Sequence, residues 1–148
     1  MKKMMEKIKK NNKGFTLVEL IVVIAVLAVI TVVIAPQYIK YVEKSRIGTD
    51  ENAIGEIAHI AEVEYVELEA RNKVSGTVEL QVNCDATFSV EGKSGVGKDD
   101  LATAVTEMMG QYKTKSKAYA NADVVITLDE HGRASWTAKS GNVAESGN

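Results

Sequence analysis

A glycine-rich stretch is the first pattern in this chain that could do chemistry. Residues 92–99 read GKSGVGKD, one residue short of the phosphate-binding pattern G-x-x-x-x-G-K-[ST]. In that pattern the backbone cradles phosphates and the final hydroxyl binds Mg²⁺, but here Asp99 takes its place and would repel a phosphate. The chain also lacks the strand–helix repeats of a parallel nucleotide-binding sheet. We therefore predict no direct nucleotide binding, and interpret the stretch as a loop leading to a helix capped by Asp99 or Asp100.

The remaining candidates for catalysis or metal binding are isolated. His59 and His131 are far apart and belong to no Cys/His ligand pattern. Cys84 has no evident base beside it, and as the single cysteine it cannot form an internal disulfide. We therefore predict that the protein is not an enzyme and that it has no catalytic residues, no metal site and no cofactor.

The most unusual charge is Glu19, which lies inside the apolar run Phe15–Ala35. As a helix, these 21 residues would rise about 31 Å, close to the hydrocarbon thickness of a bilayer. A carboxylate at the centre of a bilayer helix costs about 2.5–3.5 kcal/mol on insertion scales, although Glu19 lies near the end, where reaching the interface lowers that cost. A functional reason for Glu19 is therefore expected.

The segment before the apolar run is strongly basic. Met1–Gly14 carries six lysines and one acidic residue, which predicts a cytoplasmic N-terminus and a C-terminal part outside the membrane. A cleavable secretory signal has a shorter apolar core and a small-residue cleavage site, whereas here Pro36 directly follows Ala35. A plain signal anchor fits the length but explains neither Gly14 nor Glu19.

Residues 9–41 resemble the class III signal of type IV prepilins and pseudopilins. The resemblance rests on the sequence KGFTLVEL at residues 13–20, the long apolar run after it, and Pro36-Gln37-Tyr38 beyond that run. It combines a basic leader, a junction glycine, a phenylalanine, a buried glutamate and a proline in one register. None of these features is specific by itself, but their combination in this order is specific for such a signal.

The resemblance implies a role for each matched residue. Prepilin peptidase would cut between Gly14 and Phe15 and N-methylate the new amine of Phe15. Glycine suits such a site because its backbone can approach a catalytic group closely. Glu19 would then pair with the Phe15 ammonium of a neighbouring subunit and set the axial register during assembly, and Pro36 would break the helix.

The remaining chain predicts an α+β fold, and the resemblance implies that this fold is pilin-like. The helical spacing of apolar residues from Gln37 to Arg71 predicts an amphipathic second half of a long N-terminal α-helix, whose first half spans the membrane. This helix would pack on a small antiparallel β-sheet head, with Trp136 against it. The predicted elements of the head are strands at Thr77–Asn83 and Ala86–Glu91, a helix at Leu101–Gln111, and a hairpin of Asp123–Leu128 and Arg133–Lys139 with its turn at residues 129–132.

Four segments follow from these patterns. They are a cleaved basic leader at 1–14, a transmembrane and fibre-core helix at 15–36, a globular head with the second half of the helix at 37–140, and a flexible C-terminal tail at 141–148. The formal net charge of −2 conceals an asymmetry, because the leader side chains sum to +5 and the rest of the chain to −7.

The resemblance implies a structural subunit of a type IV pilus that forms a helical homo-oligomer. Its expected partners are prepilin peptidase, the pilus assembly ATPase with its membrane platform, and membrane lipid before assembly. The fibre would serve adhesion, twitching motility or DNA uptake, with DNA or a host surface left open as its ligand. The alternatives are a pseudopilin of a type II secretion or competence system, and an uncleaved membrane-anchored extracellular binding module.

The expected location changes with assembly. Before it, the subunit would cross the cytoplasmic membrane once; after it, the subunit would be part of an extracellular pilus. The absence of a disulfide is typical of pilins from monoderm bacteria, which favours a Gram-positive host.

Overall fold

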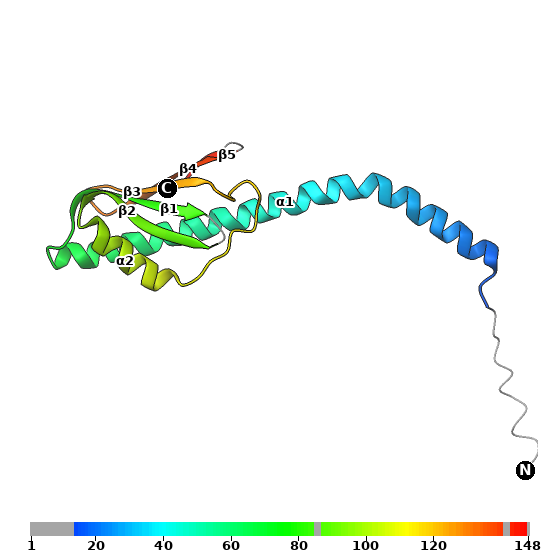
Figure 1. Ribbon diagram of the computed structural model, residues 1–148, viewed down its shortest axis with the longest axis horizontal. Helices are drawn as coiled ribbons and strands as arrows, with labels where there is room; N and C mark the ends of the chain where they lie inside the picture. Colours follow the sequence, from blue (N-terminus) through cyan, green and yellow to red (C-terminus); the bar gives the residue numbers. More distant parts are fainter. Residues whose placement is uncertain (1–13, 85–86, 141–142, 148) are drawn as a thin grey trace, which may run out of the picture. The chain divides into compact units, whose positions relative to one another are not determined.

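The computed structural model describes residues 14–84, 87–140 and 143–147. It divides into two compact units, a first that ends at Lys40 and a second at Tyr41–Asn148. The elements in order are α1 (Leu17–Ala70), β1 (Ser75–Cys84), β2 (Phe88–Val96), α2 (Lys98–Met109), β3 (Asp123–Leu128), β4 (Ala134–Ser140) and β5 (Val143–Gly147), drawn in Figure 1. A long N-terminal helix and a small antiparallel sheet confirm the predicted α+β, pilin-like fold.

The first unit consists of the N-terminal part of α1 and the residues before it. Here α1 contains a stretch that is long and apolar enough to cross a membrane, and none of that stretch is buried within the chain. Its polar side chains are satisfied locally: the hydroxyl of Thr31 donates to the carbonyl of Leu27 at 2.7 Å. The unit therefore presents apolar side chains on all sides, as expected for a helix that is covered by lipid or by other helices.

Pro36 lies inside α1 rather than at its end. Proline has no amide hydrogen, so the carbonyl of Val32 receives no helical hydrogen bond from it. The helix nevertheless continues to Ala70. Pro36 therefore interrupts one hydrogen bond of the helix, as predicted, without ending the helix.

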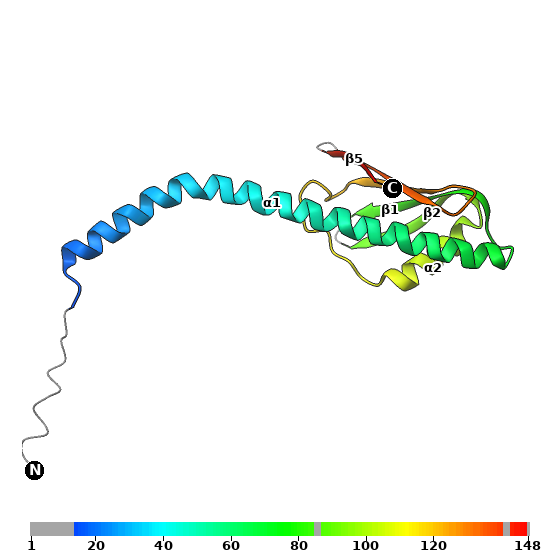
Figure 2. The ribbon, with the colours of Figure 1, turned by 180° about the vertical axis from the view of Figure 1, so that it is seen from behind.

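In the second unit, α1 packs along one face of the sheet through a single buried stripe (Figure 2). The stripe recurs every three or four residues, as amphipathic spacing requires. Its members are Asp50, Ala53, Ile54, Ile57, Ala58, Ala61, Tyr65 and Leu68. All but the first are hydrophobic, so the stripe joins the core of the sheet.

The sheet has the order β2-β1-β3-β4-β5, and every neighbouring pair is antiparallel. The predicted hairpin is confirmed, because β3 pairs with β4 in the register Ile126↔Trp136. Trp136 is only 9% exposed and lies with Ala58 of α1 around one small groove, as predicted. Residues 143–147 pair with β4 as β5, so this part of the segment at 141–148 is a strand and not the tail that we expected.

The start of α2 and the end of β2 differ most from the sequence prediction. The second helix starts at Lys98, and its N-cap is Gly97 (φ 76°) with no side-chain cap, so neither Asp99 nor Asp100 caps it. Glycine accepts this left-handed conformation without a steric penalty. Strand β2 extends to Val96, beyond the predicted Glu91, and Ala86 lies outside the described residues.

Candidate functional site

The predicted cleavage site lies in non-helical backbone. Gly14 and Phe15 precede the first residue of α1, Leu17, and the Phe15 side chain is 88% exposed. A side chain added at Gly14 would meet nothing within 4 Å. Among the described residues, packing within the single chain therefore gives no reason for a glycine at this position.

Glu19 caps the start of its own helix together with Thr16. Its Oε2 accepts hydrogen bonds from the backbone N–H and the hydroxyl of Thr16, both at 2.8 Å, and the Thr16 Oγ1 accepts from the Glu19 N–H at 3.2 Å. This is a capping box, in which each side chain satisfies an amide that the helix leaves unpaired. The Thr-x-x-Glu spacing is a local signal for such a cap, whereas the sequence prediction gave Glu19 only a role in assembly.

The capping geometry leaves part of the Glu19 carboxylate available. Both hydrogen bonds that the carboxylate accepts from Thr16 go to Oε2, and Oε1 takes part in neither. A cation approaching Oε1 could therefore pair with Glu19 without displacing Thr16.

A second polar centre, Asp50, is absent from the residues predicted from the sequence. It is fully buried in α1 of the second unit. Its carboxylate accepts hydrogen bonds from the Tyr112 hydroxyl at 2.9 Å, the Lys115 N–H at 3.0 Å, and the Ser116 N–H and hydroxyl at 2.8 and 2.6 Å. A charged residue at a position of the predicted apolar stripe was the signal that could have revealed it.

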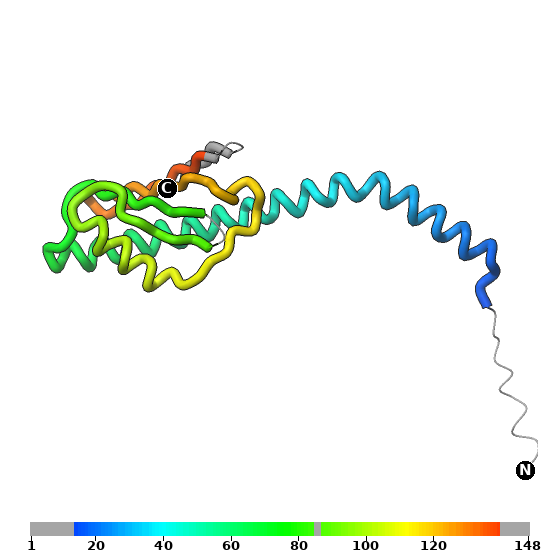
Figure 3. Tube along the Cα trace, in the orientation of Figure 1, coloured from blue at the N-terminus to red at the C-terminus, as the bar shows by residue number. Residues whose placement is uncertain are grey.

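Asp50 anchors the loop between α2 and β3 to α1. This loop, residues 110–122, passes beside α1 in the trace of Figure 3. About two turns earlier in the helix, the Glu43 carboxylate accepts a further hydrogen bond from the Lys117 N–H at 2.6 Å. Two helix carboxylates thus hold three successive backbone amides, so the loop is fixed at defined positions despite its lack of regular structure.

The environment of Asp50 alters the acidity of Tyr112. Burial, the hydrogen bond to Asp50 and the negative charge of that carboxylate together raise the pKa of Tyr112 to about 12. In the unfolded chain the phenol ionises near pH 10. Between about pH 10 and pH 12 the unfolded chain therefore releases a proton that the folded chain retains, and the free energy of unfolding falls as the pH rises.

We expect Tyr112→Phe to lack this alkaline loss of stability. The difference in unfolding free energy between the unaltered protein and the variant should be constant below about pH 9 and should shrink between pH 10 and 12. Urea unfolding of the full chain in detergent, followed through the single tryptophan, measures it. Tyr41→Phe, at an exposed tyrosine, is the matched control and should follow the unaltered protein; equal pH profiles for both variants would contradict the assignment.

The glycine-rich stretch at 92–99 is explained by close backbone packing. A Cβ at Gly95 would lie 2.6 Å from the carbonyl oxygen of Thr77, and one at Gly97 would lie 2.2 Å from that of Lys73. The amine of Lys98 donates to the carbonyl of Gly92 at 3.3 Å and pairs with Asp99 at 2.9 Å. Gly95, Gly97 and Lys98, which match the phosphate-binding pattern in part, thus make contacts within the fold.

The other sequence candidates lie apart from one another. His59 is exposed on α1, 3.3 Å from a carboxylate oxygen of Glu62, and His131 lies in the β3–β4 turn. Cys84 is buried at the end of β1. Within the described ranges, no three His, Cys, Asp or Glu side chains are grouped so that they could hold a metal ion.

Comparison with known proteins identifies only the N-terminal segment. Residues 9–35 match the family model described as the prokaryotic N-terminal methylation motif. The match covers the leader junction, the capping box and the apolar stretch of α1, and supports a type IV pilin or prepilin. Searches of curated proteins and of solved structures gave no match.

Proposed function

We propose, from the N-terminal methylation motif at residues 9–35, that this chain is a structural subunit of a type IV pilus. Prepilin peptidase would cut between Gly14 and Phe15 and methylate the amine of Phe15. The subunit would then polymerise through its N-terminal apolar helix. The fibre would act in adhesion, twitching motility or DNA uptake.

The observation that carries this proposal is the uncovered apolar helix within the motif. The large apolar side chains from Leu17 to Ile34 are each about half or more exposed in the single chain. An apolar surface of this size is unfavourable in water, so the helix needs to be covered by lipid before assembly and by other helices after it. Lateral packing of identical helices satisfies that need and gives a helical homo-oligomer.

Glu19 gives such packing a defined register. A helix without polar groups can slide along its neighbour at little cost, whereas a buried charge is favourable only beside its partner. The Phe15 ammonium of a neighbouring copy supplies that partner once the leader is removed. Cleavage would thus create the cation that the Glu19 carboxylate binds, so only processed subunits would assemble.

Mass spectrometry of the mature N-terminus tests the proposal. We expect a chain that begins at a methylated Phe15, whereas a chain that retains Met1–Gly14 would support the uncleaved binding module instead. Gly14→Val should keep the leader, because a branched side chain blocks close approach to the peptide bond. Leu17→Val, a similar change two residues beyond the new N-terminus, is the control and should be processed normally.

A pseudopilin would share the same N-terminal chemistry, so processing alone does not separate the two. Shearing of cells distinguishes them, since a pilus subunit should dominate the released fibres and a pseudopilin should be found only in traces. In either case the assembly ATPase and membrane platform would extract the subunit from the bilayer.

A further inference from the structure

We propose that the lysine loop of one copy, Lys113, Lys115 and Lys117, docks against the acidic groove of a second copy, which is lined by Glu91, Asp99 and Glu107. The proposal rests on the proposed function, because it names a contact between the second units of subunits in the fibre. It assigns that contact to electrostatic complementarity, in addition to the packing of apolar helices.

The lysine loop presents its charges from a fixed backbone. The N–H groups of Lys115 and Lys117 are held by Asp50 and Glu43 at 3.0 and 2.6 Å. Ser116 between them is buried, so the flanking lysines point outward and all three are exposed. A loop held in this way loses little conformational freedom when it binds a partner.

The charges of the lysine loop are not neutralised within the chain. Across the described residues, no carboxylate lies within 4.0 Å of the amines of Lys113, Lys115 or Lys117. Asp50 and Glu43 of α1 instead accept hydrogen bonds from the loop amides, and the amine of Lys115 lies 5.6 Å from the centre of the Tyr112 ring. Three cations are thus available to an external partner.

The acidic groove lies between β2 and α2. It is lined by Glu91 of the strand and by Asp99, Thr103, Thr106 and Glu107 of the helix. Glu91 and Glu107 are exposed and, among the residues that the structure describes, form no ion pair, whereas Asp99 pairs with Lys98. A concave surface with two unpaired carboxylates and two hydroxyls is suited to lysine side chains.

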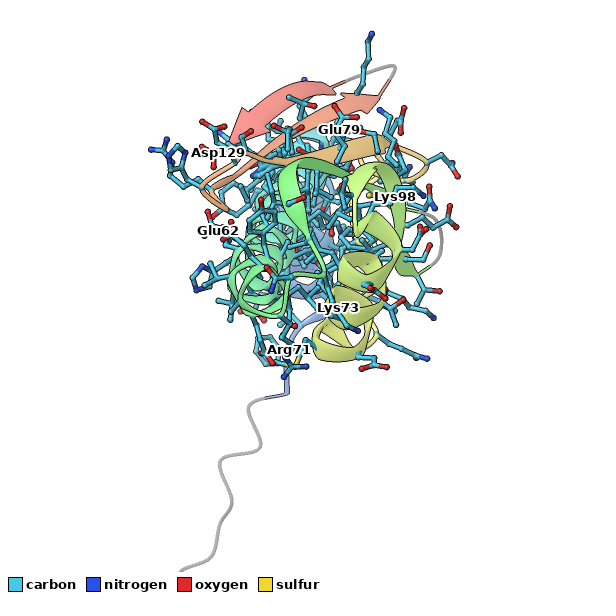
Figure 4. The ribbon with its side chains drawn as sticks, turned by 90° about the vertical axis from the view of Figure 1, so that its left-hand side faces the viewer. Glu62, Arg71, Lys73, Glu79, Lys98 and Asp129 are labelled. Carbon is cyan, nitrogen blue, oxygen red and sulfur yellow. The ribbon has the colours of Figure 1, made fainter. Side chains whose placement is uncertain are left out.

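A second surface that could bind the lysine loop is the end of the sheet near the α1–β1 loop. It carries charges of both signs, so the acidic groove is the better partner for the lysine loop. Figure 4 shows Arg71 and Lys73 there, together with Glu62, Glu79 and Asp129, whereas Lys98, also labelled, pairs with Asp99 of the groove. Several of these charges are already paired within the chain, as in Arg71–Glu67 and Arg133–Asp129. That end would therefore attract the lysine loop less than the groove does.

The overall charge favours a second copy over a nucleic acid as the occupant. Residues 41–148 carry 11 basic and 18 acidic side chains, so a polyanion approaching the lysine loop is repelled by the rest of the unit. Another copy offers an excess of carboxylates instead. The contact joins different surfaces of two identical chains, and a heterologous contact of this kind builds a filament when its rotation does not close into a ring.

Charge reversal in cells tests the contact. In the variant K113E/K115E/K117E, we expect the yield of sheared fibres per membrane-bound subunit to fall about tenfold or more, because like charges then face each other. The control R71E/K73E/K139E makes the same change of net charge at three exposed basic residues elsewhere and should stay within about twofold of the unaltered yield. Thermal unfolding of each full chain in detergent checks that all remain folded.

A charge swap makes the test specific. E91K/E107K alone should also lower the yield, and combining it with K113E/K115E/K117E in one chain should restore fibres, because the facing charges are opposite again. An unchanged yield in the lysine variant, an equal loss in the control, or no restoration by the swap would overturn the contact. A lysine variant that instead loses binding to phosphatidylglycerol vesicles, with no restoration by the swap, would assign the loop to lipid and overturn it too.

Failure of the proposed function gives a different result. The unaltered chain would then yield no fibres and no methylated Phe15, and both proposals would fall together. If the unaltered chain gives fibres with methylated Phe15 while the reversals have no effect, only the docking contact is wrong.

Discussion

Replacing Asp50 with alanine should lower the free energy of unfolding of the second unit by about 3–5 kcal/mol. The substitution leaves the Tyr112 hydroxyl, two backbone amides and the Ser116 hydroxyl without their shared acceptor in a buried site. Each unsatisfied buried donor costs about 1–3 kcal/mol, and the loop that they hold would detach from α1. For a unit of this size, the melting temperature should fall by more than about 10 °C.

Fluorescence of the single tryptophan, Trp136, measures this effect in the full chain in detergent. Glu51→Ala is the matched control, because this carboxylate is next in the helix. It accepts a long hydrogen bond, 3.5 Å, from the Tyr119 hydroxyl, so we expect the free energy of unfolding to fall by less than about 1 kcal/mol. If Asp50→Ala does not fold, Asp50→Asn keeps the shape and one acceptor oxygen and should lose an intermediate amount. Equal stability of the Asp50 and Glu51 variants would show that Asp50 does not anchor the loop.

Replacing Glu19 with alanine should leave membrane insertion intact and reduce fibre assembly severely. Insertion is driven by the apolar residues of α1, and removing a carboxylate makes it more favourable. Assembly loses the group that would bind the Phe15 ammonium of the neighbouring subunit. Immunoblots of membranes and of sheared fibres from the same cells measure the two effects separately, and an unchanged fibre yield would contradict the register role.

Thr16→Ala separates this register role from helix capping. It removes the hydroxyl that Glu19 contacts but keeps the carboxylate and the backbone N–H of Thr16. Loss of a capping side chain costs about 0.5–2 kcal/mol of local helix stability, which the apolar environment of α1 should tolerate. If Thr16→Ala reduced fibres as strongly as Glu19→Ala, the function of Glu19 would be to cap the helix and not to set the register.

Much of the fold could be predicted because its signals are local. The apolar spacing at Ile54, Ile57 and Ala61 predicted the buried stripe of α1, and the residues around the turn at 129–132 predicted the β3–β4 hairpin. The start of α2 was missed because Gly97 fits the left-handed N-cap position that we assigned to an acidic side chain. Strand β5 was missed because its pairing with β4 does not depend on a local apolar alternation.

The candidate site divides in the same way. The order of residues at 9–35 alone identified the methylation motif, the apolar stretch long enough to cross a membrane and the position of Glu19, because these signals lie within one linear segment. Only the tertiary structure showed that Asp50 holds the loop of Lys115 and Ser116, residues more than sixty positions away in the chain. Buried polar contacts of this kind depend on which distant segments the fold brings together, and local sequence patterns do not predict which segments these are.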